Sequence, residues 1–178
     1  MEKVALSGNY FWHALYTKSR AEKKALTELQ SREIEAFLPL HRKLRQWSDR
    51  KKWVEMPLIP GYLFVKVSRR EYDAALHSNY IVAYVKFEGS AAIIPEKQID
   101  YLKLLLKQNN LEIEIVREKL EPGQTVEVIA GPLIGLKGKL IRQNSKSKVA
   151  IELENIGHSA LVEISPDDIA VVDQETGD

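Results

Sequence analysis

The hydrophobic pattern of the chain changes near Pro122, and this change predicts two domains of different architecture. Before residue 109, apolar runs typical of strands alternate with runs at helical spacing, which favours an α/β sandwich of about 100 residues. Short β-branched runs follow Pro122, at residues 125–129, 136–141, 148–153, 160–164 and 169–172. Five such strands in about 50 residues predict a small five-stranded β-barrel. The expected fold class is therefore α+β.

The segment between these halves, residues 109–121, is acidic and has no clear period. We interpret it as a linker. Its partial alternation leaves a strand as the alternative. The predicted organisation is a first domain over 9–108, this linker, and a second domain over 122–173.

Several elements of the first domain can be placed from spacing alone. They are a strand at 10–16, a helix at 21–32, a strand at 34–40, a hairpin at 42–53, a strand at 62–67, a helix at 70–78, a strand at 81–87 and a helix from Pro95. Ser19 and Glu22 have the spacing of a capping box, which predicts that they close the first turn of the first helix. We expect Trp47 and Trp53 to pair across the hairpin and stiffen it, with base stacking as the alternative role.

The strand at 62–67 has two different faces, because alternate residues point to opposite sides of a sheet. One face is apolar and consists of Leu63, Val65 and Val67. The other carries Tyr62 and Phe64 beside Lys66. Two aromatic rings beside a lysine predict a face partly open to solvent and available to a partner. Burial on both sides is the alternative.

Positive charge is concentrated in the first part of the chain. Residues 1–70 carry 15 Lys and Arg against 7 Asp and Glu, whereas the remainder carries 11 against 18. The cations gather at the start of the first helix, at Lys18, Arg20, Lys23 and Lys24, and in the hairpin, at Arg42, Lys43, Arg45, Arg50, Lys51 and Lys52. Such clusters are suited to contact a phosphate backbone, with solvated surface charge as the alternative.

No set of residues indicates catalysis. The histidines, His13, His41, His77 and His158, lack the short spacing of metal ligands, and the chain has no cysteine. The glycine-rich segment 131–139 lacks phosphate-loop spacing. We expect no catalytic residue, metal or cofactor, and no enzymatic activity. Apolar runs fall short of the roughly 20 residues of a membrane span, and no signal peptide is evident, so a cytoplasmic protein without membrane contact is expected.

Four segments in order carry a resemblance to a known family. They are Trp12–Tyr16 before a helix, Pro60–Val65, Tyr84–Pro95 before a helix, and Pro122–Gly138. Together they resemble the N-terminal (NGN) domain and the KOW motif of NusG, a family of transcription elongation factors. The segments Trp47–Lys52 and Pro57–Tyr62 are similar to UpxY-type antiterminators, relatives of RfaH that serve capsular polysaccharide operons.

The resemblance implies a non-enzymatic factor that binds the clamp helices of the largest RNA polymerase subunit and suppresses pausing or termination. The matching positions of the polymerase-binding cavity are Tyr62, Phe64 and Phe87. The nontemplate DNA strand would meet Lys18, Arg20, Lys24 and Arg32. The hairpin would contact DNA or the opposite wall of the polymerase cleft through Arg50, Lys51 and Lys52. RfaH has a histidine where this chain has Glu28, so its sequence preference is not implied here.

The second domain is implied to recruit a small-subunit ribosomal protein or the Rho factor through Ile156, in a monomeric protein. In RfaH this domain also folds as a helical hairpin that masks the polymerase site. Here the runs at 125–129 and 148–153 are β-branched, which favours sheet over helix. We therefore expect a barrel that does not mask the first domain. The alternative function is a KOW-containing, RNA-binding factor associated with the ribosome or with translation.

Overall fold

The computed structural model describes residues 9–108, 111–117, 123–143 and 146–172. The chain divides into two compact units, residues 1–96 and 97–178. This division falls at the start of the helix that follows Pro95, whereas the sequence placed the boundary within 109–121.

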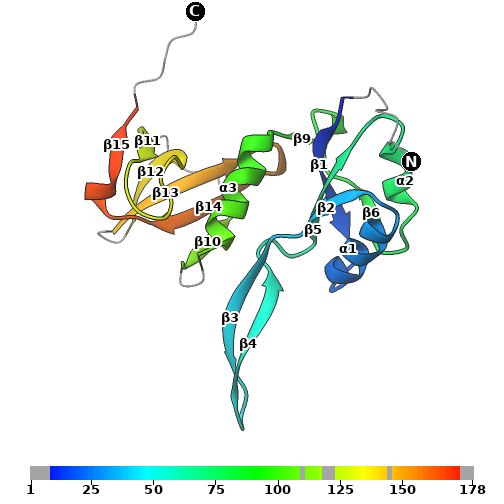
Figure 1. The fold of residues 1–178 in the computed structure, drawn as a ribbon, viewed down its shortest axis with the longest axis horizontal. Helices are drawn as coiled ribbons and strands as arrows, with labels where there is room; N and C mark the ends of the chain where they lie inside the picture. The colour runs from blue at the N-terminus through cyan, green and yellow to red at the C-terminus, as the bar shows by residue number, and fades with distance from the viewer. Residues whose placement is uncertain (1–8, 109–110, 118–122, 144–145, 173–178) are drawn as a thin grey trace, which may run out of the picture. The chain divides into compact units, whose positions relative to one another are not determined.

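The first unit is built on an antiparallel sheet with strand order β2-β5-β1-β6 (Figure 1). Its strands are β1 (Phe11–Thr17), β2 (Glu35–Phe37), β5 (Tyr62–Val67), β6 (Ile81–Tyr84) and β9 (Ile93–Ile94), which also pairs with β1. The centre is the pairing of β1 with β5, in register from Phe11↔Val67 to Tyr16↔Tyr62. Aromatic and β-branched residues make up most of both strands, as a pleated and buried surface favours.

Two helices, α1 (Glu22–Ser31) and α2 (Tyr72–Leu76), pack on one face of this sheet. Ala25 and Leu29 of α1 and Ala75 of α2 belong to one buried cluster. The strand residues of that cluster include Leu15, Leu63, Val65, Val67, Ile81 and Tyr84. The apolar face predicted for the strand at 62–67 is therefore the face that the helices cover.

The start of α1 differs from the expected capping box. Ala21 is the N-cap and makes no side-chain cap hydrogen bond, so Ser19 does not close the helix. Glu22 is instead buried, and its Oε1 accepts a hydrogen bond from the backbone N–H of Gly61 at 2.9 Å. Gly61 has φ of +83°, a conformation that favours glycine. The carboxylate of Glu22 thus fixes the turn that leads into β5.

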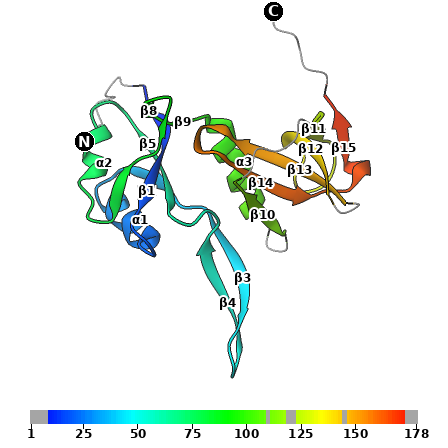
Figure 2. The ribbon, with the colours of Figure 1, turned by 180° about the vertical axis from the view of Figure 1, so that it is seen from behind.

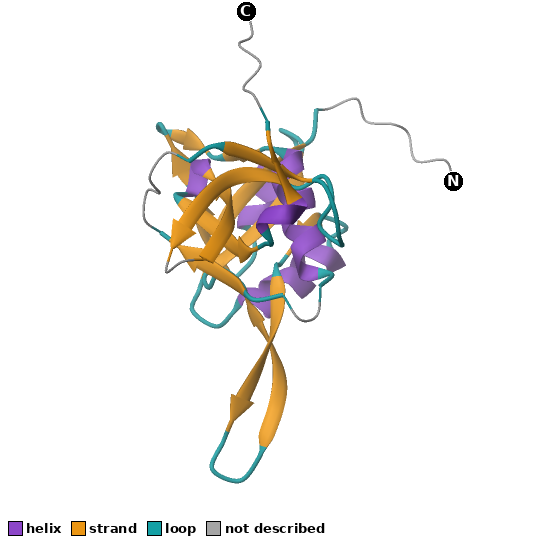
Figure 3. Ribbon diagram, turned by 90° about the vertical axis from the view of Figure 1, so that its left-hand side faces the viewer, coloured by secondary structure: helices purple, strands orange, loops and turns teal. Residues whose placement is uncertain are grey.

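Strands β3 (Leu40–Gln46) and β4 (Lys51–Pro57) form a separate antiparallel hairpin that extends away from the sheet of the first unit (Figure 3). Its base is closed by the hydrogen bond from Leu58 N–H to Pro39 O, at 2.7 Å. From α1, Lys23 Nζ donates to Glu55 O at 3.0 Å. The short strands β7 (Lys86–Phe87) and β8 (Ser90–Ala91) form a second small hairpin. Figure 2 labels β8 close to β9, which follows it in the chain.

The second unit contains α3 (Glu96–Leu106) and one antiparallel sheet with strand order β10-β14-β13-β12-β11-β15. The strands are β10 (Ile113–Val116), β11 (Thr125–Val128), β12 (Lys137–Gln143), β13 (Lys146–Leu153), β14 (His158–Glu163) and β15 (Ile169–Val171). Short 3₁₀ turns, Glu154–Ile156 and Pro166–Asp168, precede the last two strands. The β structure predicted for this part is confirmed, and residues 125–128 and 146–153 are not helical.

The predicted five-stranded barrel is not confirmed, although its five strands are present. The sheet has six strands. Within the described residues, β10 and β15 stand at its two ends and do not pair with each other, so no closed barrel is found. The additional strand lies in the segment interpreted as a linker, where Ile113 pairs with Val162 and Val116 with Ser159. The strand alternative therefore holds for residues 113–116. The alternation of Ile113 and Ile115 with glutamate was the signal for it.

Gly138 allows β12 and β13 to approach closely. A Cβ atom at this position would lie 2.4 Å from the carbonyl oxygen of Ala150 and 2.7 Å from Cγ1 of Val149. Both neighbours are buried, and the first is backbone, so neither can move without shifting the strand pair.

We expect Gly138→Ala to lower the free energy of unfolding of this sheet by about 1–3 kcal/mol, the usual cost of overpacking a core. Chemical denaturation followed by far-UV circular dichroism measures this loss. The neighbouring Lys137→Ala removes only a surface ion pair with Glu127 and should cost less than about 1 kcal/mol. Equal stability of Gly138→Ala and the wild type would contradict the close approach.

Candidate functional site

The second face of β5 carries a row of aromatic contacts between neighbouring strands. The Phe64 ring lies 6.2 Å from that of Phe37 on β2, and the Tyr62 ring lies 5.1 Å from that of Tyr16 on β1. Lys66 continues the row. Its Nζ is 5.9 Å from the Trp12 ring and 2.6 Å from Glu96 Oε1.

This face is not open to solvent in the way the sequence predicted. Phe64 is 0% exposed and Tyr62 is buried, so burial on both sides holds for these two residues. The physical reason is that each ring packs against a ring from an adjacent strand. Tyr16 is the member of the row that remains exposed.

Phe87 differs from Tyr62 and Phe64 in its surroundings. It lies on β7, opposite Ser90, and is 44% exposed. The turn that follows it has positive φ at Glu88 and Gly89. Of the three aromatic residues expected from the resemblance to form a polymerase-binding cavity, Phe87 is the one whose side chain is exposed, while the other two are buried in the neighbouring sheet.

The cations at the start of α1 are exposed but do not all lie on the helix. Lys18 follows β1 and its N–H donates to Tyr80 O at 2.9 Å. Arg20 occupies the turn before the helix with φ of +58°, so it does not share a helical face with Lys24. Lys24 Nζ lies 5.9 Å from the Tyr80 ring. None of these three cations is in an ion pair within the part of the chain that the structure covers.

Arg32 is held by neighbouring groups. Its guanidinium forms an ion pair with Glu28 and donates to the carbonyl oxygens of Ala74 and His77 at 3.5 and 3.4 Å. Glu28 also accepts from Ser78 Oγ at 2.6 Å. This network joins the end of α1 to α2, so Arg32 has a structural role in the first unit.

The hairpin register separates the two tryptophans that were expected to pair. Trp53 is opposite Leu44, whereas Trp47 lies beyond the last residue of β3 and donates its N–H to Arg50 O at 2.8 Å. The expected Trp47–Trp53 pair is therefore wrong, because positions 47 and 53 are on opposite faces of the hairpin. Lys51 and Lys52 open β4 opposite Gln46 and Arg45, and Arg50 precedes them in the turn.

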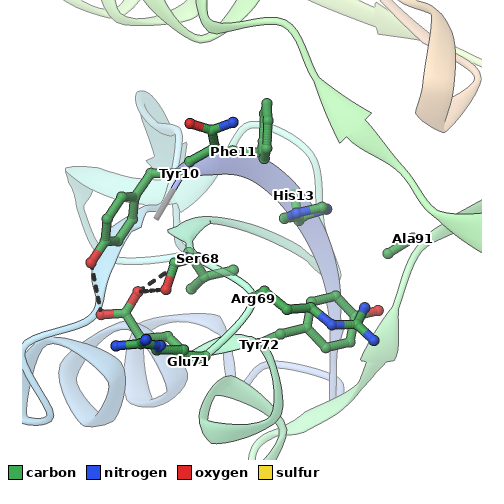
Figure 4. A pocket seen from close by; sticks show the side chains of 11 residues that line it. Tyr10, Phe11, His13, Ser68, Arg69, Glu71, Tyr72 and Ala91 are labelled. Atoms are coloured by element: carbon green, nitrogen blue, oxygen red, sulfur yellow. Dashed lines mark hydrogen bonds between the residues drawn. The ribbon is translucent and has the colours of Figure 1, made fainter. Parts of the chain in front are cut away.

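A cavity of about 600 Å³ lies between the start of β1 and the segment after β5 (Figure 4). Its lining includes the rings of Tyr10, Phe11, His13 and Tyr72 and the side chains of Arg69 and Arg70. Glu71 accepts from Ser68 Oγ at 2.9 Å and from Tyr10 OH at 3.5 Å. The sequence analysis missed this cavity because its residues come from three separate segments.

His13 lines this cavity and is itself buried. Burial lowers the pKa of His13 below its usual value, against the opposing effect of the Ala92 carbonyl, whose oxygen lies 3.1 Å from Nδ1. The ring stands edge-on to Tyr72 and Tyr84, which are themselves stacked 4.0 Å apart. His13 therefore serves packing in this structure.

Ile156, the expected contact of the second domain, ends a 3₁₀ turn before Gly157, whose φ is +65°. Its side chain is only 8% exposed. Its carbonyl oxygen lies 2.7 Å from Nδ1 of His158. Among the described residues there is no cluster of three or more His, Cys, Asp or Glu able to hold a metal ion. In the same residues, no helix is long and apolar enough to cross a membrane.

Comparison with known proteins places this fold in a family. Residues 10–103, more than half of the chain, match the family described as "Transcription termination factor nusG". No curated protein matches. The solved structure titled "Domain interaction in Thermotoga maritima NusG" is 16% identical, has a TM-score of 0.51, and the match covers 92% of this chain and 97% of that one.

A second solved structure, titled "Crystal Structure of MjSpt4:Spt5 complex conformation B", is 19% identical over 90% of this chain and 96% of that one, with a TM-score of 0.30. At 16% identity, the likeness to the Thermotoga maritima structure shows a similar fold alone. The assignment to a family rests on the match of residues 10–103. Since that match spans the β1–β5 sheet, both helices that cover it and most of α3, the chain belongs to the NusG family of transcription factors.

Proposed function

We propose that this protein is a transcription elongation and antitermination factor that binds RNA polymerase through its first domain and suppresses pausing or termination. The observation that carries the proposal is the family match over residues 10–103, which includes the strand Tyr62–Val67 and the exposed Phe87. The similarity of Trp47–Lys52 and Pro57–Tyr62 to UpxY-type antiterminators supports action at particular operons, such as capsular or exopolysaccharide loci.

In this proposal the clamp helices of the largest polymerase subunit meet the surface around Phe87. Tyr62 and Phe64 are buried, so they shape the underlying sheet, whereas the Phe87 ring is free to be covered by a partner. The proposal keeps the domain limits predicted from the sequence. Residues 9–108 form the polymerase-binding domain, residues 109–121 form the linker between the domains, and residues 122–173 form the KOW-like domain.

The nontemplate DNA strand is proposed to lie along Lys18, Arg20 and Lys24. These three cations are exposed and without ion pairs among the described residues, so their charge is available to phosphates. Arg32 is a weaker candidate because Glu28 neutralises it. The hairpin residues Arg50, Lys51 and Lys52 are exposed and are proposed to contact DNA or the opposite wall of the polymerase cleft.

The second domain is proposed to recruit a small-subunit ribosomal protein or Rho through the turn at Ile156, with the protein acting as a monomer in the cytoplasm. Because Ile156 is mostly buried, this contact requires the turn to adjust on binding. The mechanism is mechanical. A domain that bridges the polymerase cleft disfavours the open, paused enzyme, and no bond is made or broken.

The alternative, an RNA-binding factor of the ribosome, requires free cations on the second sheet. Four of its lysines are instead paired with glutamates, namely Lys137, Lys139, Lys146 and Lys148 with Glu127, Glu152, Glu163 and Glu114. Pairing reduces the positive potential that attracts a phosphate backbone. This observation favours the polymerase proposal.

We expect Phe87→Ala to weaken binding to core RNA polymerase about tenfold, since covering one aromatic side chain contributes about 1.5–3 kcal/mol. Titration of labelled protein with core polymerase measures the affinity. Val82→Ala on β6 is the matched control, because Val82 is also an exposed apolar residue, and it should bind as the wild type does. Phe64→Ala is a poor test, because truncating a fully buried Phe costs about 3–5 kcal/mol of stability. Unchanged affinity of Phe87→Ala would remove this ring from the interface.

Charge reversal at Lys18, Arg20 and Lys24 is expected to reduce antipausing activity and to flatten its dependence on salt, because fewer counterions are then released from DNA. Pause-escape assays over a salt series measure both effects. Lys107→Glu, which reverses one charge on an exposed residue of the second unit, serves as the control for each single reversal. A photocrosslinker at position 20 should label the nontemplate strand. Labelling of protein alone would rule out this path for the DNA.

A further inference from the structure

The hairpin exposes large aromatic surface that contributes nothing to a core. Trp53 is 59% exposed and Trp47 is 43% exposed. Leu44, which pairs with Trp53 across the hairpin, is exposed as well. An exposed tryptophan ring forgoes much of the stabilisation that burial of its area would give. The separation of the two rings in the register removes the stiffening role, and both rings keep a large exposed surface.

The cations of the hairpin surround these rings. On the face of Trp53, Lys51 lies two residues toward the tip and Arg42 lies on the other strand toward the base. The opposite face carries Lys43, Arg45 and Lys52. Residues two apart on a strand are about 6.8 Å apart along it, so cationic side chains reach to either side of the ring.

Most of this charge is not neutralised. Across the described residues, the hairpin contains one ion pair, between Arg42 and Glu55 at 3.9 Å. Lys43, Arg45, Arg50, Lys51 and Lys52 form none, and Asp49 is the only other acidic residue between Leu40 and Pro57. The hairpin is therefore an exposed aromatic surface within a field of positive charge.

We propose that this hairpin is a binding site for single-stranded nucleic acid, in which an unpaired base stacks on Trp53 and adjacent phosphates are bound by Lys51 and by Arg42, whose ion pair with Glu55 is long, at 3.9 Å, and exposed. The inference rests on the proposed function and deepens it by assigning a mode of recognition to the hairpin. Stacking on aromatic side chains with cations along the backbone is how proteins bind single strands with little sequence preference.

The chemistry selects a single strand over two other ligands. Bases in a duplex are stacked on each other, so their faces are closed to a tryptophan ring. A protein partner would be expected to meet apolar surface with few uncompensated charges, whereas five unpaired cations surround these rings. The shared ligand chemistry, a base with its phosphate, is present both in an exposed DNA strand and in RNA.

The test uses the full-length protein and its intrinsic tryptophan fluorescence. Trp12 is buried in the sheet, so the solvent-exposed emission comes from Trp47 and Trp53. We expect a 12-nucleotide oligo-dU or oligo-rU at low salt to quench this emission, and the duplex of the same length to bind more weakly. Comparison of the affinities for oligo-dU and oligo-rU shows whether the hairpin prefers DNA or RNA.

Trp53→Leu should weaken oligonucleotide binding about tenfold, as expected for loss of one stacked base, whereas Trp53→Phe should retain most of it. Binding of the variants is followed by anisotropy of a labelled oligonucleotide. The matched control, Trp12→Phe, leaves both hairpin rings in place and should bind as the wild type does.

Equal oligonucleotide affinity of Trp53→Leu and the wild type would overturn the proposal. The proposal would also be overturned if the protein bound core polymerase but no oligonucleotide. In that case, a loss of polymerase affinity in Trp53→Leu would assign the Trp53 ring to a protein contact. Oligonucleotide binding without polymerase binding would support this site while contradicting the proposed function, so the two failures are distinguishable.

Discussion

The antiparallel pairing of β1 with β5 is the interaction on which the rest of the first unit depends. At one end of the pair, Thr17 N–H donates to Gly61 O at 2.9 Å, and Gly61 N–H donates to the buried Glu22. This end therefore positions Lys18 and the start of α1. The same pair directs Leu63, Val65 and Val67 toward the helices and the aromatic row toward the opposite face.

The two units use charge in different ways. In the second unit, lysines and glutamates pair across the surface of the sheet, which reduces the positive electrostatic potential of that surface. In the first unit, the cations at the turn before α1 and those along the hairpin other than Arg42 remain without ion pairs among the described residues. The uneven charge of the sequence thus corresponds to exposed cations on the elements proposed to face nucleic acid.

Much of the fold could be predicted from the sequence because its signals are local. The strand at 62–67 is where alternation placed it, and the five β-branched runs are all strands. The errors arise where long-range contacts decide. Glu22 has the spacing of a capping box but hydrogen-bonds Gly61, which is 39 residues away. The linker segment has a local signal for a strand in the alternation of Ile113 and Ile115 with glutamate, but its pairing with β14, far along the chain, decides that β10 forms.

The candidate site was harder to predict than the fold. The resemblance led to the prediction of Tyr62, Phe64 and Phe87, but only packing shows that the first two are buried and the third is exposed. The register of the hairpin, which separates Trp47 from Trp53, depends on where its turn closes. The most direct test of the central claim is a photocrosslinker that replaces Phe87 in the whole chain, added to an assembled transcription elongation complex together with small ribosomal subunits. The account predicts an adduct with the largest polymerase subunit, and adducts confined to ribosomal components would contradict it.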